Sequence, residues 1–199
     1  GGGARAGGNG TGLGNVGRRG GRKGVDQARS ALPKVGQMAM VWTNANGASS
    51  RSVRSVRDAA VNAGIAIREL RAASAQEVES LLGTLTRERT DALVVLSDPF
   101  LIIQREKIGA FGRARGIPVF AQVGEFTRAG ALMSYGTDYS GDFGRSAHFV
   151  DRILKGAKPG DLPIEQAATF ELVINKKTAA LLGLTIPMTV QLQATEVIE

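Results

Sequence analysis

Four short apolar segments recur along the chain at nearly equal spacing, and this spacing is the strongest constraint on the fold. They begin at residues 37, 65, 91 and 117, which lie 28, 26 and 26 positions apart. Each segment has the length of a β-strand, and helical patterns at 51–63 and 101–115 lie between them. This cadence is typical of βα units. We therefore predict an α/β fold, a doubly wound parallel sheet with helices on both faces.

Local signals mark where several elements end. Ser74 and Glu77 have the spacing of a capping box, and Asn175 is predicted to cap the helix that begins at residue 176. Gly116 follows the predicted helix 101–115, as expected of a left-handed C-terminal cap. A further strand is predicted at 131–136, followed by a helix over 139–155.

The segment 92–96 has the character of a central strand. Its five residues are all apolar, and it ends at Ser97, Asp98 and Pro99. A run without alternation is typical of a strand that is buried on both faces. A common strand order for such sheets, 2-1-3-4, places strand 37–42 directly beside it. The turns after Trp42 and Ser97 would then meet at the carboxyl edge of the sheet, where ligands bind in open α/β folds.

Polar residues in and near these turns form the predicted binding site. The loop after Trp42 offers neutral amides and hydroxyls, and the helix predicted at 51–63 presents free N–H groups suited to a carboxylate. Asp98 could pair with an amine or could only cap the following helix, and turn formation explains the Asn and Ser residues equally well. The residues assigned to ligand binding are Asn44, Asn46, Ser49, Ser50, Asp98, Glu125 and Tyr135.

Positive charge is concentrated near the N-terminus. The formal net charge is +7, and residues 1–30 hold six basic residues against one acidic residue, together with 12 of the 27 glycines. Because each glycine in a helix costs about 1 kcal/mol relative to alanine, we expect a weak helix or a disordered leader there. An Arg/Gly-rich leader could bind single-stranded nucleic acid, but it lacks an aromatic residue for base stacking, so we expect no nucleic-acid partner.

The residues needed for common catalytic and metal sites are scarce. The chain has one histidine, His148, and no cysteine. A Cys/His metal cluster is therefore excluded, and a Ser-His-Asp triad would depend on a histidine that lies inside a predicted helix. We predict no enzymatic activity, no metal and no cofactor. No apolar run reaches the 18 residues of a membrane span, so no membrane insertion is expected. The first residues carry no secretion signal pattern.

With these residues laid out, the chain resembles the ABC-transporter substrate-binding protein family, which has the type I periplasmic-binding fold. The matching stretches are 8–13, 31–35, 97–99, 130–136, 151–159, 170–179 and 182–187. The resemblance implies that a small organic molecule, possibly an amino acid, is captured in a cleft between two lobes and delivered to a membrane permease. It also implies a periplasmic or extracytoplasmic location. A small-ligand-sensing α/β regulatory domain without a transport role is the alternative.

The same resemblance implies that the chain holds one lobe plus part of a second, and lacks most of the N-terminal lobe. Residues 1–30 would be a leader that contains a lobe crossing. The second, ligand-binding lobe would comprise 31–128 and 165–199. Residues 129–164 would belong to the truncated first lobe.

Overall fold

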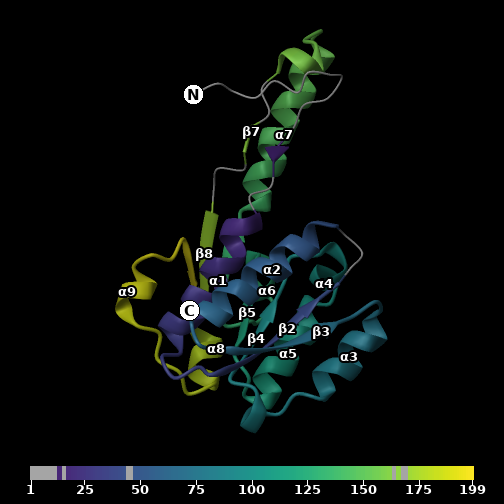
Figure 1. Ribbon diagram of the computed structural model, residues 1–199. Coiled ribbons are helices and arrows are strands. Elements are labelled where there is room, and N and C mark those ends of the chain that lie inside the picture. The colour runs from purple at the N-terminus through teal and green to yellow at the C-terminus, as the bar shows by residue number, and fades with distance from the viewer. Residues whose placement is uncertain (1–12, 15–16, 44–46, 163–164, 167–169) are drawn as a thin grey trace. The chain divides into compact units, whose positions relative to one another are not determined.

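The computed structural model describes residues 13–14, 17–43, 47–162, 165–166 and 170–199. The chain divides into two compact units (Figure 1). The larger unit comprises Gly17–Gly136 and Glu171–Glu199, and the smaller unit comprises Gly1–Val16 and Thr137–Phe170. Among the residues described, no helix is both long enough and apolar enough to cross a bilayer.

The larger unit is built on a seven-stranded sheet in the order β3-β2-β4-β5-β6-β8-β9. The neighbours β2–β3, β2–β4, β4–β5, β5–β6 and β8–β9 pair in parallel. The prediction that the first and third segments are parallel neighbours is confirmed, since Val41 of β2 lies opposite Val95 of β4. The strands are β2 (Gln37–Trp42), β3 (Ala66–Arg71), β4 (Ala92–Val95), β5 (Val119–Ala121), β6 (Met133–Thr137), β8 (Phe170–Asn175) and β9 (Glu196–Ile198).

Strand β8 runs in the opposite direction to β5 and β6. Near its start, Glu171 accepts a hydrogen bond from the N–H of Gly124, which follows the end of β5. At its end, the N–H of Asn175 donates to the carbonyl of Leu132, which precedes β6. The sheet is therefore mostly parallel, with the β8–β9 pair reversed.

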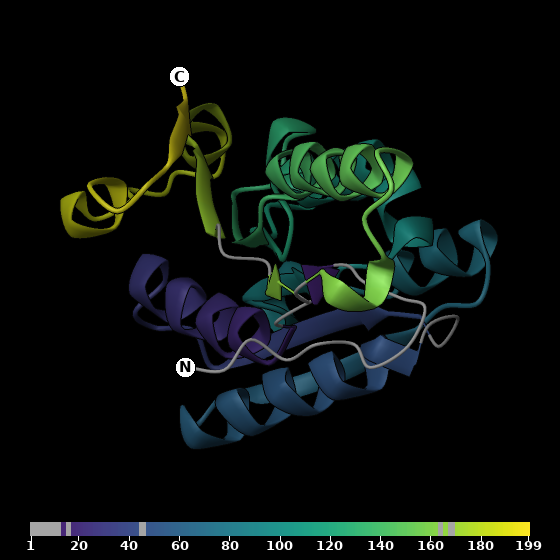
Figure 2. The ribbon, with the colours of Figure 1, turned by 90° about the horizontal axis from the view of Figure 1, so that it is seen from above.

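Helices cover both faces of this sheet, as predicted. Met40, Val94 and Phe120 project from adjacent strands into one core with residues of α1 and α2, and these two helices run side by side (Figure 2). On the opposite face α5 packs closely against β5, and a Cβ added to Gly112 would lie 2.4 Å from the side chain of Val119. The helices are α1 (Gly17–Ala31), α2 (Gly47–Asn62), α3 (Ala75–Gly83), α4 (Pro99–Ile103), α5 (Arg105–Arg115), α6 (Gly124–Arg128), α8 (Lys176–Leu181) and α9 (Met188–Gln191).

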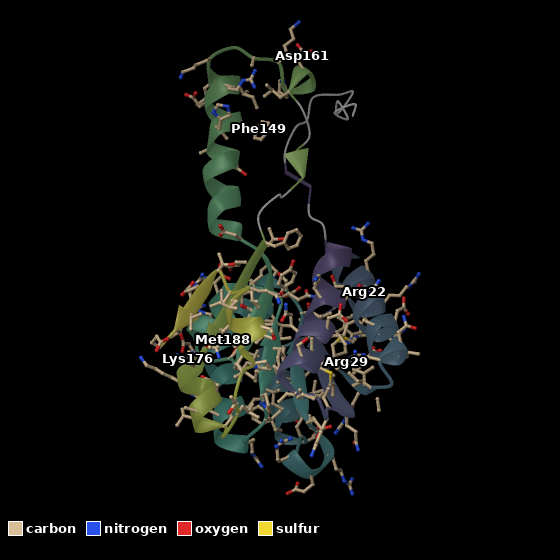
Figure 3. All side chains as sticks on the ribbon, turned by 90° about the vertical axis from the view of Figure 1, so that its left-hand side faces the viewer. Arg22, Arg29, Phe149, Asp161, Lys176 and Met188 are labelled. Carbon is tan, nitrogen blue, oxygen red and sulfur yellow. The ribbon has the colours of Figure 1, made fainter. Side chains whose placement is uncertain are left out.

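Helix α1 corrects the expectation of a disordered leader. Residues 17–31 form a helix despite four glycines, and its Val25 and Ala28 are fully buried in the core shared with α2. Arg22 and Arg29 remain exposed (Figure 3). Most helix stability in proteins comes from packing of an apolar face, and here that packing outweighs the poor helix propensity of glycine. Residues 17–30, predicted from the sequence to belong to a leader, group with the larger unit in the structure.

Two further helix boundaries differ from the sequence prediction. Helix α2 begins at Gly47 rather than at residue 51. The helix predicted at 101–115 is divided at Gln104 into α4 and α5. The predicted ends hold elsewhere: Ser74 accepts from the N–H of Glu77, and Gly116 closes α5 with a φ of 67°.

The described part of the smaller unit contains one long helix and one short strand pair. Helix α7 (Tyr139–Leu154) matches the predicted helix and buries Phe149 (Figure 3). Strands β1 (Leu13–Gly14) and β7 (Glu165–Gln166) pair in parallel. The segment that we expected to return to a first lobe was 129–164, whereas residues up to Gly136 group with the larger unit, because β6 pairs with β5.

Candidate ligand-binding site

Strands β2, β4 and β5 are adjacent and parallel, so their carboxyl ends meet at one edge of the sheet. Thr43 follows β2, Ser97 and Asp98 come shortly after β4, and Gln122 follows β5. The chain leaves β2 outward to β3 and returns to β4 on the other side. This edge is therefore the topological switch point, the position where open α/β sheets bind their ligands.

The pairing register of the central strands shows which residues line this edge together. Met40, Val94, Phe120 and Met133 lie opposite one another across the four strands. Because side chains alternate between the faces of a strand, the residues two positions further on share the same face. These four residues, which we call the edge row, are Trp42, Leu96, Gln122 and Tyr135.

Unpaired polar atoms gather at the same edge. Four buried atoms there have no hydrogen-bond partner among the described residues, namely Trp42 Nε1, Thr43 Oγ1, Asp98 Oδ2 and Gln122 Nε2. Leaving a buried donor or acceptor unpaired costs about 1–3 kcal/mol, so such groups are rare in proteins and call for an explanation. Two further atoms of this kind, Thr127 Oγ1 and Ser134 Oγ, lie in α6 and β6. The concentration at the switch point makes this edge the candidate ligand site.

The two carboxylate oxygens of Asp98 differ in their contacts. One carboxylate oxygen, Oδ1, accepts from the N–H of Phe100 at 2.9 Å and caps α4. The other, Oδ2, is buried without a partner in the described chain, and the residue is only 2% exposed. Capping therefore uses half of the carboxylate, and the remaining oxygen is suited to a cationic or N–H donor group.

The other residues predicted to bind ligand stand as follows. Asn44 and Asn46 lie outside the described residues. Ser49 lies in the first turn of α2, and Ser50 is exposed there. Their placement in a helix rather than a loop follows from the earlier start of α2. Glu125, in the first turn of α6, and Tyr135, in β6, are each partly exposed. The ligand contacts of all seven predicted residues stay predictions.

Sequence reasoning missed Gln122 and the indole N–H of Trp42 as candidate polar groups. Gln122 is 8% exposed and stands directly after the β5 segment in the sequence. Its position after the third parallel strand was the available signal, since polar residues at that point of adjacent strands converge. Trp42 packs against the core, but its Nε1 is unpaired within the described residues.

One carboxylate near this edge is already paired. Glu171 accepts from the Gly124 N–H and pairs with Arg128 at 2.9 Å, and Arg128 also pairs with Glu196 at 2.6 Å. These contacts, with Glu196 the stronger, raise the pKa of Arg128 above its ordinary value against the opposing effect of burial. Glu171 is thereby excluded from the candidate set, since its charge is satisfied. The described residues contain no group of three or more acidic or histidine side chains that could hold a metal ion.

Known proteins resemble the chain along nearly its whole length. A family model described as ABC transporter substrate binding protein matches residues 3–198. A conserved domain protein from Vibrio cholerae is 28% identical, with a TM-score of 0.84 over 94% of this chain and 62% of that chain. The ABC domain from Streptococcus pneumoniae, solved in complex with L-Trp, is 26% identical, with a TM-score of 0.84 over 98% of this chain and 66% of that chain.

A curated relative, the tyrosine-binding protein of Clostridioides difficile, is 22% identical over 78% of this chain and 45% of its own length. The chain thus spans between 45% and 66% of the length of these three relatives. The family match, which covers almost every residue, agrees with the mostly parallel sheet and its switch point. The chain belongs to the ABC transporter substrate-binding protein family.

Proposed function

We propose that this protein binds an amino acid at the carboxyl edge of its seven-stranded sheet and delivers it to an ABC permease in the membrane. The observation that carries the proposal is the set of unpaired polar atoms on Trp42, Thr43, Asp98 and Gln122 at the switch point. A periplasmic or extracytoplasmic location goes with this role in the family.

The chemistry of the edge favours a ligand with an amino group. Asp98 Oδ2 is a buried acceptor beside a capped helix start, and hydrogen bonds between an ammonium and a carboxylate are stronger than those between neutral groups. Two relatives support the same class, because one was solved with L-Trp and another is named for binding tyrosine. Trp42 and Tyr135 in the edge row offer aromatic surface for such a side chain.

Calorimetric titration with L-tryptophan and L-tyrosine tests the proposal directly. We expect binding, together with a rise in melting temperature, because a ligand present at 100 times its Kd stabilises the folded state by about 2.7 kcal/mol. Indole-3-propionate, which lacks the ammonium, is the matched control ligand and should bind far more weakly. If no amino acid binds or stabilises the protein, the amino-acid assignment is wrong.

Substitution of Asp98 by asparagine isolates the charge at the site. The asparagine oxygen still accepts from the Phe100 N–H, so the helix cap is kept while the negative charge is lost. Because a hydrogen bond to a charged group contributes about 1.5–3 kcal/mol, affinity for L-tryptophan should fall roughly 10- to 150-fold. Unchanged affinity would remove Asp98 from the site.

Transport is a separate question from binding. In cells that lack the protein, uptake of the labelled amino acid should fall and recover when the gene is restored. Tight binding without any effect on uptake would instead favour the ligand-sensing alternative.

A further inference from the structure

We propose that Gln122 determines the specificity of this site by donating a hydrogen bond from Nε2 to a carboxylate oxygen of the ligand. The role of Gln122 rests on the proposed function and adds to it the residue that contacts the ligand carboxylate. Gln122 lies in the middle of the edge row, directly after β5, with Leu96 on one side and Tyr135 on the other.

A hydrogen bond from the backbone fixes the orientation of the Gln122 amide. The backbone N–H of Ser97 donates to Gln122 Oε1 at 3.0 Å. An N–H can only donate, so the atom that faces Ser97 must be the amide oxygen rather than the nitrogen. The amide nitrogen, with its two hydrogens, is therefore directed away from Ser97.

This nitrogen is buried and has no partner within the described part of the chain. The residue is 8% exposed, so water does not readily replace the missing acceptor. The hydrogen bond from Ser97 uses only the amide oxygen, so the described fold makes no use of the NH₂ group. A ligand acceptor accounts for the half of the amide that the fold leaves unused.

Close packing of the backbone holds Gln122 in place. A Cβ on Gly136 would lie 1.7 Å from the carbonyl oxygen of Gln122, so at this point β6 approaches β5 more closely than any residue with a side chain allows. A donor on a fixed backbone is preorganised for binding, because little freedom is lost when the ligand arrives.

Asp98 adds a hydrogen-bond acceptor to the donor that Gln122 supplies. Gln122 is bonded to Ser97, and the next residue, Asp98, carries the unpaired acceptor Oδ2. An unpaired donor after β5 and an unpaired carboxylate oxygen after β4 complement a molecule with a carboxylate and an ammonium group, which is the common part of all α-amino acids.

The substitution Gln122→Glu tests this donor specifically. Glutamate has the same shape and keeps an oxygen for the Ser97 N–H, but it replaces the donating NH₂ by a negatively charged acceptor. Gln122→Met is the matched control, because it keeps the length and removes both polar atoms. Affinity is measured by calorimetry for L-tryptophan and for tryptamine, which lacks the carboxylate, and thermal unfolding confirms that both variants are folded.

For L-tryptophan we expect a loss of at least 100-fold with Gln122→Glu and of about 10-fold with Gln122→Met. For tryptamine we expect no loss with either variant, since the contact that they disturb is absent. Equal losses for both ligands, or no loss for L-tryptophan, would overturn the role of Gln122 while leaving amino-acid binding intact. If the parent protein binds neither L-tryptophan nor L-tyrosine, the proposed function fails and the role of Gln122 fails with it.

Discussion

Polar side chains at the two ends of the same sheet differ in how many of their polar atoms have hydrogen-bond partners. At the amino-terminal ends of the parallel strands, Asp91 Oδ2 accepts from the N–H groups of Gly36 and Gln37, each at 2.8 Å. At the same end, Asn175 caps α8 through Oδ1 and donates from Nδ2 to the carbonyl of Thr127. At the carboxyl edge, Asp98 and Gln122 each use one polar atom and leave the other buried and unpaired within the described chain.

This difference separates residues that stabilise the fold from residues that are available for binding. Side chains of similar type occur at both ends, so residue type alone does not distinguish them. What distinguishes them is the number of partners: a side chain whose polar atoms are paired contributes to stability, and a buried polar atom without a partner reduces it. Natural proteins accept such costs at functional sites.

The largest expected effect concerns the backbone rather than the side chains. Gly136→Ala places a Cβ 1.7 Å from the carbonyl oxygen of Gln122, and we expect a loss of about 3 kcal/mol in the free energy of unfolding, because overpacking forces the strands apart. The matched control is Gly36→Ala at the other end of the sheet, where the new Cβ meets only Asp91 at 3.9 Å. That change should be neutral or stabilise by about 0.5 kcal/mol. Urea unfolding of both variants measures the contrast.

A smaller loss is expected when a fully paired side chain is removed. Asn175→Ala deletes a helix cap and leaves the carbonyl of Thr127 without its buried donor, so we expect a loss of about 2 kcal/mol in the free energy of unfolding. Asn175→Asp retains the capping oxygen and should lose only part of this amount. A stability within 0.5 kcal/mol of the parent in urea unfolding would contradict the assignment of this end to stability.

The smallest effect on stability is expected at the carboxyl edge. Gln122→Met removes the acceptor for the Ser97 N–H, which is unfavourable, and removes the unpaired NH₂, which is favourable. These two contributions to stability are similar in size, so the free energy of unfolding should change by about 1 kcal/mol or less. The melting temperature measures this change. A loss as large as that of Asn175→Ala would show that Gln122 serves the fold, and the contrast between the two ends would disappear.

The fold could largely be predicted from the sequence because its signals are local and periodic. Strand spacing gave the α/β class and the pairing of β2 with β4, and the caps at Ser74 and Asn175 follow from residues three positions away. Helix α1 could not be predicted, since its stability depends on Val25 and Ala28 packing against residues far along the chain.

The position of the candidate site could be predicted from the sequence, but the pairing of its polar atoms could not. The strands that precede the turns after Trp42 and Ser97 are adjacent and parallel. Asp98 carries one of the unpaired atoms. Gln122 was missed because the sequence reveals that a residue is polar but not how many of its atoms find partners. That number depends on the register between β4 and β5.

The position of Arg128 has a consequence for the last part of the chain. Its guanidinium joins α6 both to Glu171 in β8 and to Glu196 in β9. Two strands that are separated by 20 residues thus share a single ionic anchor. Loss of that anchor removes one ionic contact from each strand at once, whereas β8 keeps its hydrogen bonds to Gly124 and Thr127 of α6. We therefore expect β9 to separate from α6 before β8 does.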